Sequence, residues 1–257
     1  MDGHPYVIDD YFGQKGILSI LTILIIHEIM SGIQFKNVYK SYSKKHTFGN
    51  LNLDLSLNQI VNVVGPKKSG KTTLLNLLSG VESNFKGDII IDEHLIDEHT
   101  KSLVSYCPSS LMFDMKSKIK DLLNLYKAIF DFDLDKTMKF FAENSININK
   151  RLGSLKLKDQ YLVQLLLTLG RNAKIYLIDD LFLKLKGQEL LDILEIIKEY
   201  SSRSLIILTS ESCQVCESFA SLFLFFEKGK LSKAVSKYEL HEKKSVNSFS
   251  WEVFSNV

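Results

Sequence analysis

The sequence predicts an α/β fold built on a mainly parallel sheet. Short, largely apolar runs at residues 60–64, 175–178 and 205–210 are the first indication, because strands buried on both faces of a parallel sheet are apolar along their length. Segments with helical periodicity alternate with these runs, as they do in α/β folds. A glycine-containing loop also leads from the first run straight into a helical pattern, an arrangement typical of an anion-binding strand–loop–helix unit.

The loop after residue 64 carries a phosphate-binding pattern. Gly65, Gly70, Lys71 and Thr72 match G-x-x-x-x-G-K-[ST], in which backbone N–H groups cradle phosphates, the lysine reaches the terminal phosphates and the hydroxyl binds Mg²⁺. The anion would also lie at the positive end of the helix that begins near Lys71. The alternative is a chance match in a turn. The residues expected to bind nucleotide are Gly65, Pro66, Lys67, Lys68, Ser69, Gly70, Lys71, Thr72 and Thr73. The pattern therefore predicts a P-loop NTPase core that binds a nucleoside triphosphate.

A second part of the site is expected at the end of the apolar run 175–178. A phosphate-binding loop needs a partner carboxylate for Mg²⁺ at the end of a neighbouring buried strand, and Asp179 directly follows this run. Asp180 comes next, where a general base or a water-positioning carboxylate would lie. The alternative is an aspartate pair that merely ends a strand and caps a turn.

Composition excludes several other classes of protein. The 257 residues carry a formal net charge of +2 without a basic stripe, so no nucleic-acid partner is expected. The three cysteines are too few for a secreted disulfide framework and indicate a reducing compartment. Cys213 and Cys216 form a single C-x-x-C, whereas a zinc ribbon needs two such pairs, so we interpret both as small apolar residues on a helix.

Residues 33–234 are expected to form one nucleotide-binding domain. Its N-terminal portion is β-rich, because residues 33–38 and 51–57 alternate as strands do. Residues 116–170 are mostly helical in pattern and are expected to form an inserted helical subdomain. Residues 235–257 are expected to be a polar C-terminal tail.

Residues 1–32 are expected to be an N-terminal extension outside this domain. The apolar run at residues 17–26 is shorter than the roughly 20 apolar residues of a membrane-spanning helix. No small-residue cleavage site follows the run, which argues against a signal peptide. Translation from Met30 would omit this segment, and the alternative is an N-terminal helix apposed to a membrane.

The order of these features resembles the nucleotide-binding subunit of an ATP-binding cassette (ABC) transporter. Tyr42 lies where this family places an aromatic ring that stacks on adenine. Three further segments resemble its Walker A motif (65–73), the start of its Q-loop (106–108) and its Walker B motif (175–179). The resemblance implies the ABC ATPase fold, with ATP and Mg²⁺ as ligands. A guanine nucleotide is less expected because no Asn-Lys-x-Asp occurs in the chain.

The chain departs from the family pattern where the signature motif is expected. Counting back from Asp179 places Lys156 at the family's signature serine and Lys158 at its signature glycine. In the family these two positions approach the γ-phosphate bound by the opposite subunit. A lysine in place of the glycine would oppose close approach, although its charge could compensate if the stem folds away.

Three further departures concern the γ-phosphate. Ser109 or Ser110 occupies the position of the Q-loop glutamine, so Ser109 is a weaker candidate Mg²⁺ contact. Asp180 stands in place of the catalytic glutamate, which pulls the carboxylate back by about 1.5 Å and can cost on the order of 100-fold in rate. Glu211 stands in place of the switch histidine and is an anion that only accepts hydrogen bonds, so it should repel phosphate.

The resemblance implies an ATP-binding subunit that dimerises against a transmembrane, export-type permease subunit on the cytoplasmic face of the cell membrane, with weak hydrolysis. The dimer could be a homodimer or a heterodimer with another ABC ATP-binding subunit. A second hypothesis is a non-catalytic regulatory subunit, in which bound ATP only fixes the dimer. A small-molecule kinase is a weaker third, because the segment between Lys71 and Asp179 is long and helical.

Overall fold

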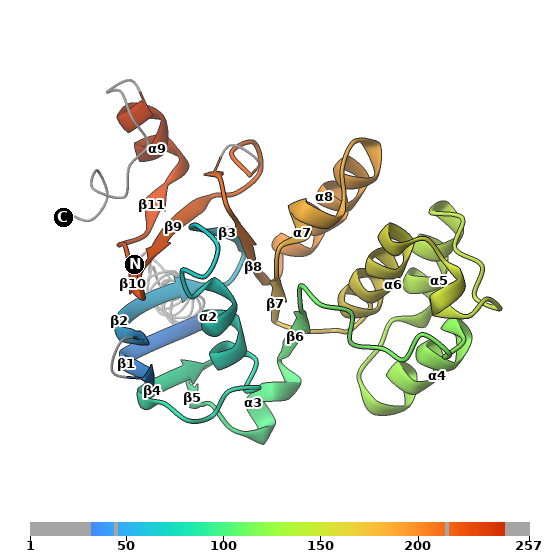
Figure 1. Cartoon of the computed structure of the whole chain (residues 1–257), viewed down its shortest axis with the longest axis horizontal. Coiled ribbons are helices and arrows are strands. Elements are labelled where there is room, and N and C mark those ends of the chain that lie inside the picture. Colours follow the sequence, from blue (N-terminus) through green and yellow to red (C-terminus); the bar gives the residue numbers. More distant parts are fainter. Residues whose placement is uncertain (1–31, 44–45, 214–215, 245–257) are drawn as a thin grey trace, which may run out of the picture.

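The computed structural model describes residues 32–43, 46–213 and 216–244. Two β-sheets form one half of the molecule, and a group of helices forms the other half (Figure 1). Of the predicted N-terminal extension, only Gly32, the first residue of β1, is described; its apolar run and Met30 lie outside the described residues.

The larger sheet is mainly parallel, as the sequence predicts. Its path runs β10-β9-β3-β8-β7-β6, and β11 pairs with β9. The five parallel strands are β3 (Gln59–Val64), β6 (Val104–Cys107), β7 (Ile175–Ile178), β8 (Leu205–Ser210) and β9 (Leu222–Glu227). The short strands β10 (Lys230–Leu231) and β11 (Val235–Ser236) run antiparallel to β9. Because β3, β7 and β8 are parallel neighbours, their carboxyl ends lie at the same edge of the sheet.

The smaller sheet is antiparallel and accounts for the β-rich N-terminal portion. It contains β1 (Gly32–Ser43), β2 (His46–Ser56), β4 (Lys86–Ile91) and β5 (His94–Leu95), in the order β2-β1-β4-β5. The strand β1 extends further than the alternating pattern predicts. The capping box of Asp97 and Thr100 starts the short helix α3 (Glu98–Ser102), and β6 begins at Val104 shortly after it.

Helix α2 (Lys71–Leu78) lies between the two sheets. Its leucines are buried on both sides, since they pack against the small sheet and against one face of the parallel sheet; they are Leu74, Leu75, Leu77 and Leu78. The helix ends at its C-cap Ser79, and Gly80 follows with a φ of 71°, a conformation that glycine adopts readily. This burial on two sides fixes the start of α2, and with it the phosphate-binding loop.

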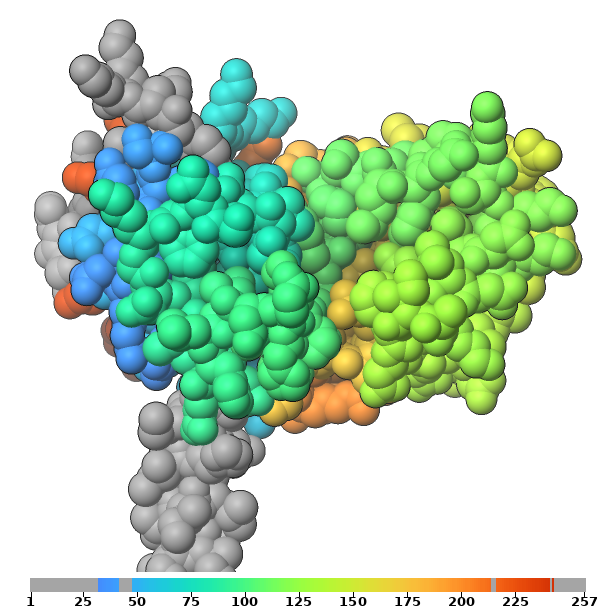
Figure 2. Space-filling model, turned by 90° about the horizontal axis from the view of Figure 1, so that it is seen from below, coloured from blue at the N-terminus to red at the C-terminus, as the bar shows by residue number. Residues whose placement is uncertain are grey.

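The opposite face of the parallel sheet packs against α6 (Leu157–Leu169) and α8 (Gln188–Ser201). The range 116–170, predicted to be helical, contains α4 (Ile119–Ile129), α5 (Leu134–Glu143), the 3₁₀ helix η1 (Leu152–Ser154) and α6. Figure 2 shows these helices, in green and yellow, beside the sheet half in blue and teal. The helix α7 (Leu181–Lys184) follows the parallel strand β7, and α9 (Lys237–Lys244) lies in the predicted tail.

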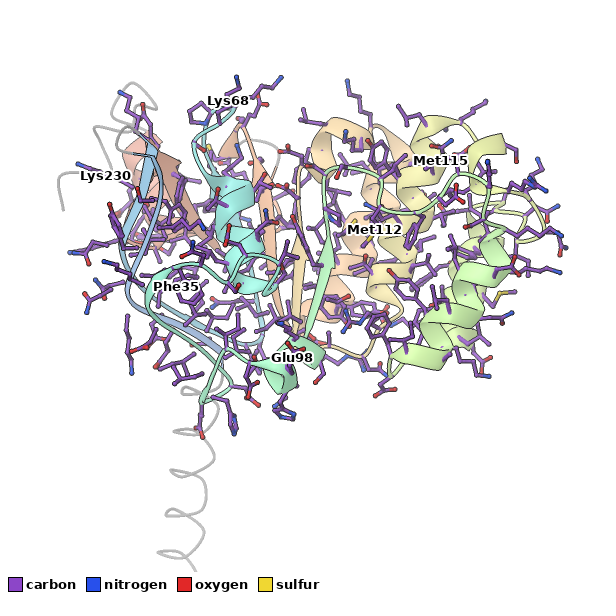
Figure 3. The ribbon with its side chains drawn as sticks, turned by 60° about the horizontal axis from the view of Figure 1, so that its bottom comes forward. Phe35, Lys68, Glu98, Met112, Met115 and Lys230 are labelled. Carbon is purple, nitrogen blue, oxygen red and sulfur yellow. The ribbon has the colours of Figure 1, made fainter. Side chains whose placement is uncertain are left out.

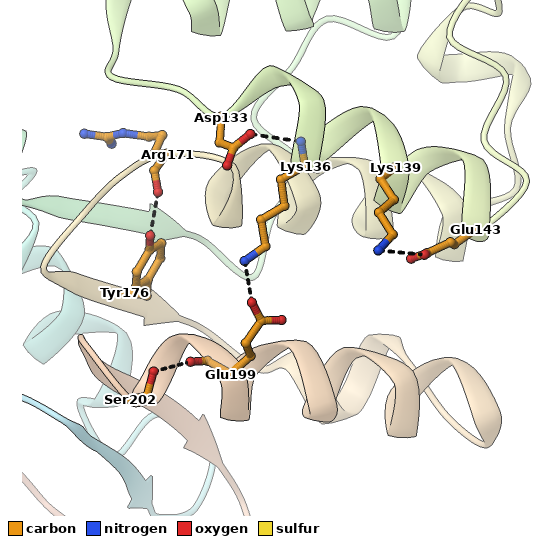
Figure 4. Close-up of polar contacts among 8 residues, drawn as sticks. All are labelled: Asp133, Lys136, Lys139, Glu143, Arg171, Tyr176, Glu199 and Ser202. Atoms are coloured by element: carbon orange, nitrogen blue, oxygen red, sulfur yellow. Dashed lines mark hydrogen bonds and ion pairs between the residues drawn. The ribbon is translucent and has the colours of Figure 1, made fainter.

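Polar and aromatic contacts tie this helical half to the sheet. Lys136 on α5 binds Glu199 Oε1 of α8 over 2.9 Å (Figure 4). Its ammonium also lies 4.1 Å from the centroid of the Tyr200 ring, and that ring packs edge-on against Tyr176 of β7 with centroids 5.2 Å apart. The contacts therefore run from α5 to the strand that precedes Asp179.

None of the helices in the described ranges is both long and apolar enough to cross a membrane.

Candidate functional site

The phosphate-binding loop joins β3 to α2 and packs against Phe226 of β9. Gly65 N–H donates to Ser210 O of β8 over 3.1 Å. A Cβ on Gly65 would lie 2.1 Å from Phe226 O, and a Cβ on Gly70 would lie 2.5 Å from the Phe226 ring. Gly70 also has a φ of 120°, which side chains strongly disfavour. Both glycines are therefore required for the loop to pass over Phe226.

The start of α2 is open for an anion. Gly70 is its N-cap, no side chain caps this end and no acidic residue lies in its first turn. The first N–H groups of a helix have no partner within the helix and carry its positive partial charge. The buried hydroxyl of Ser69 has no hydrogen-bond partner among the described residues. This polar cradle fits a phosphate group.

Lys71 is buried at the base of the loop. Its Nζ donates to Gly65 O over 2.7 Å and to Pro66 O over 3.0 Å, so the ammonium lies across the loop. Burial lowers the pKa of Lys71, and the nearby carboxylates of Asp180 and Asp179 oppose that shift. An anion bound beside this ammonium would replace part of its lost hydration.

Asp179 connects the loop with two neighbouring strands. Thr72 Oγ1 at the start of α2 donates to Asp179 Oδ2 over 2.8 Å. Thr209 Oγ1 of β8 donates to Asp179 Oδ1 over 2.6 Å and accepts from Asp180 N over 2.8 Å. Asp179 is 3% exposed. Hydroxyl groups thus fix both of its carboxylate oxygens in a buried position. The residues predicted to bind Mg²⁺ from the loop and from Walker B thus lie in direct contact.

Asp180 lies opposite the phosphate-binding loop, and its backbone conformation is constrained. Its φ of 52° places it in the left-handed region, which Asp adopts more readily than most residues. Burial, with the charge of Asp179 as the second cause, raises the pKa of Asp180. The carboxyl group of Asp180 therefore retains a proton to a higher pH than a free aspartate does.

One pocket brings most of the predicted site residues together. It is lined by the loop from Lys67 to Thr73 and, opposite, by Asp180 and Glu211; the loop residues are Lys67, Lys68, Ser69, Gly70, Lys71, Thr72 and Thr73. Lys68 lies at the tip of this loop and its side chain points away from the ribbon (Figure 3). Glu211 follows β8 and lies 3.7 Å from Lys67 Nζ, measured from Oε1.

Four other predicted residues lie elsewhere. Tyr42 belongs to β1, and its side chain is outside what the structure describes. Ser109 follows β6 and does not line this pocket. Lys156 is the N-cap of α6, and Lys158 in the first turn of that helix forms an ion pair with Glu189 of α8. This ion pair holds the side chain of Lys158 against α8 of the same chain.

The sequence analysis does not predict two residues near the site. Thr209 belongs to the apolar run 205–210, and a threonine at the carboxyl end of a buried strand is a signal that could have identified it as a site residue. Gln164, fully buried among the leucines of α6, donates to Pro108 O over 2.9 Å and to Ser110 O over 3.1 Å. It also accepts from Met112 N over 2.9 Å, so it fixes the segment that contains Ser109.

The donor set around Asp179 fits Mg²⁺. Carboxylate and hydroxyl oxygens are the ligands this hard cation prefers, and it usually takes only one or two of them from protein when substrate phosphates supply the rest. Among the described residues, no group of three or more His, Cys, Asp or Glu side chains could hold a metal by itself. Thr72 and Asp179 supply one hydroxyl and one carboxylate of this kind.

Comparison with known proteins identifies the family. The ABC transporter pattern matches residues 48–182. An uncharacterized ABC transporter ATP-binding protein of Borreliella burgdorferi is 25% identical over 245 residues, covering 86% of this chain and 49% of the relative. The xylose import ATP-binding protein XylG of Escherichia coli is 26% identical over 189 residues, covering 65% of this chain and 36% of XylG. The chain thus spans half or less of these two relatives.

Solved structures agree on the fold. An ATP-binding subunit of an ABC transporter superposes with a TM-score of 0.76 at 14% identity, covering 87% of this chain and 97% of that one. A bacterial Atm1-family ABC exporter with ATP bound gives a TM-score of 0.68 at 20% identity, covering 82% of this chain and 40% of the exporter. The chain therefore belongs to the ABC transporter family and carries its ATP-binding domain.

Proposed function

We propose that the chain binds Mg-ATP in the loop pocket and acts as the ATP-binding subunit of an ABC transporter with slow hydrolysis. The observation that carries the proposal is the contact between Thr72 and Asp179, because it joins the phosphate-binding loop to the Walker B strand. A loop that matched by chance would have no reason to meet a buried carboxylate at the end of a neighbouring strand.

Each part of the nucleotide has candidate partners. The loop N–H groups at the start of α2, with Lys71, would bind the phosphates. Thr72 and Asp179 would hold Mg²⁺, which neutralises charge on the phosphates. Tyr42 would stack on adenine, and Ser109, which does not line the pocket, stays a weaker candidate for a contact to Mg²⁺.

Slow hydrolysis is proposed from the two acidic residues opposite the loop. Asp180 has a shorter side chain than the glutamate that the family places there, and a left-handed backbone fixes where that side chain begins. Glu211 replaces a residue that can donate hydrogen bonds with one that only accepts them.

The partners follow from the family. The chain would dimerise with a second ATP-binding subunit, identical or different, and would dock on a transmembrane permease subunit at the cytoplasmic face of the membrane. We expect export, although XylG, one of the two relatives, is named for import. The second candidate function is a non-catalytic regulatory subunit, which the altered pair Asp180 and Glu211 favours.

The direct test is calorimetric titration of the protein with Mg-ATP. Lys71→Ala should weaken binding by about 1.5–3 kcal/mol, because it removes a charge-assisted contact to phosphate. Lys139→Ala is the matched control, since Lys139 is an exposed lysine of α5 whose partner is Glu143. Equal affinity of the wild type and Lys71→Ala would contradict the assignment of the pocket.

A further inference from the structure

The mouth of the loop pocket contains an ion pair that the family resemblance does not predict. Lys67 Nζ and Glu211 Oε1 lie 3.7 Å apart, and both residues line the pocket. Glu211 directly follows β8, whereas Lys67 belongs to the loop itself. The pair therefore bridges two walls of the pocket.

The side chains of Lys67 and Lys71 differ in how freely they can move. Lys71 is 7% exposed and its ammonium is bound to two backbone carbonyl groups. The side chain of Lys67 is 77% exposed, so its ammonium can move within the mouth of the pocket. Its distance of 3.7 Å from Glu211 Oε1 is that of an ion pair and is longer than a hydrogen bond, so the three donors of the ammonium can turn to another acceptor.

The ion pair reduces the electrostatic repulsion between Glu211 and a bound phosphate. A lone carboxylate at position 211 would face the phosphates beside Asp180, which also lines the pocket, and would repel them. The cation of Lys67 offsets the charge of Glu211. The repulsion expected from Glu211 alone is therefore reduced in this chain.

We propose that Lys67 binds the terminal phosphate of ATP while Glu211 positions its ammonium, so that this pair sets how strongly the site prefers ATP over ADP. The inference rests on the proposed function, since it assumes that ATP occupies the loop pocket. Asp180 and Glu211 form the wall opposite the loop, where the phosphate furthest from the nucleoside would lie. ADP lacks that phosphate and would not reach Lys67.

The test is a double-mutant cycle read out as the dissociation constants for Mg-ATP and Mg-ADP. It compares the wild type, Lys67→Gln, Glu211→Gln and the double variant at low salt, where exposed charges are weakly screened. The matched control cycle uses Lys139→Gln and Glu143→Gln. That exposed pair on α5 has an N–O distance of 3.8 Å and similar exposure, and its residues do not line the pocket (Figure 4).

We expect Lys67→Gln to weaken ATP binding about fivefold and ADP binding less than about twofold, the scale of an exposed charged contact. Glu211→Gln alone should change ATP affinity by less than about twofold, because lost positioning and lost repulsion oppose each other. In the Lys67→Gln background the same change should restore most of the lost affinity, since Glu211 is then uncompensated. The control cycle should leave both constants unchanged.

Two results would overturn the inference. One is an equal loss of ATP and ADP affinity in Lys67→Gln, which would place Lys67 away from the terminal phosphate. The other is strict additivity of the two substitutions, which would show that the residues act independently. In both cases the wild type still binds ATP, whereas absence of ATP binding by the wild type would contradict the proposed function as well. Unchanged thermal unfolding of each variant excludes misfolding as the cause.

Discussion

Thr72 Oγ1 donates a hydrogen bond to Asp179 Oδ2 over 2.8 Å, which couples the first turn of α2 to the end of β7. Thr209 fixes the other carboxylate oxygen over 2.6 Å. The candidate Mg²⁺ ligands are thus held in position by a network of hydroxyl groups.

Removing the Thr72 hydroxyl should abolish the Mg²⁺-dependent part of ATP affinity. We expect Thr72→Val to bind ATP about 10- to 100-fold more weakly in Mg²⁺, the loss typical of disturbed metal-site ligation. In EDTA, Thr72→Val and the wild type should bind ATP alike. Titration calorimetry with and without Mg²⁺ measures both values.

The control for Thr72→Val is Thr137→Val. Thr137 is a fully buried threonine of α5 whose hydroxyl donates to Asp133 O over 2.7 Å, so the same atoms are removed away from the loop. Equal Mg²⁺ dependence of ATP binding in Thr72→Val and the wild type would contradict a metal-binding role for Thr72.

A side chain at Gly70 should disrupt the loop. Gly70→Ala places a Cβ 2.5 Å from the Phe226 ring at a φ of 120°, so we expect a loss of about 1–3 kcal/mol in the free energy of unfolding and weaker ATP binding. Gly187→Ala is the control, because Gly187 also has a positive φ, 62°, but nothing lies within 4 Å of its added Cβ. Chemical denaturation measures both variants, and a smaller loss in Gly70→Ala than in Gly187→Ala would refute the packing argument.

Asp180→Asn should stabilise the nucleotide-free protein in a pH-dependent way. Burial and Asp179 raise the pKa of Asp180 above the ordinary 3.8, so ionisation of this carboxyl costs folding free energy. That cost is absent below the unfolded pKa and appears as pH rises through the raised, folded pKa. The melting temperature of Asp180→Asn should therefore exceed that of the wild type more near pH 7 than near pH 4.

Glu143→Gln supplies the reference for this comparison, because Glu143 is an exposed carboxylate on α5. The change in melting temperature of Asp180→Asn is compared with that of Glu143→Gln at each pH. An advantage of Asp180→Asn that shrinks as pH rises would contradict the raised pKa of Asp180.

The parallel strands were predictable because a strand buried on both faces requires a continuous run of apolar residues. The runs 175–178 and 205–210 coincide with β7 and β8, and glycine after α2 marks where that helix ends. The antiparallel sheet was less predictable. The order of its strands depends on pairing between distant segments, and local alternation does not specify the partner.

The site was predictable only as far as local motifs reach. The loop pattern and the aspartate after β7 named Thr72 and Asp179, and the structure places them in contact. The roles of Thr209 and Gln164, and the pairing of Lys67 with Glu211, depend on contacts between distant segments. No spacing rule encodes such contacts, so they required the fold.

Steady-state ATP turnover at saturating Mg-ATP tests the central claim, that this chain binds ATP with a weakened hydrolytic shell. The wild type should turn over far more slowly than about 10 per second, a typical enzyme rate. Asp180→Glu combined with Glu211→His should raise the rate at least about tenfold, and by more than the two single changes predict, with little change in ATP affinity. A wild-type rate near about 10 per second would contradict the claim, as would a double variant that binds ATP but is no faster than the wild type.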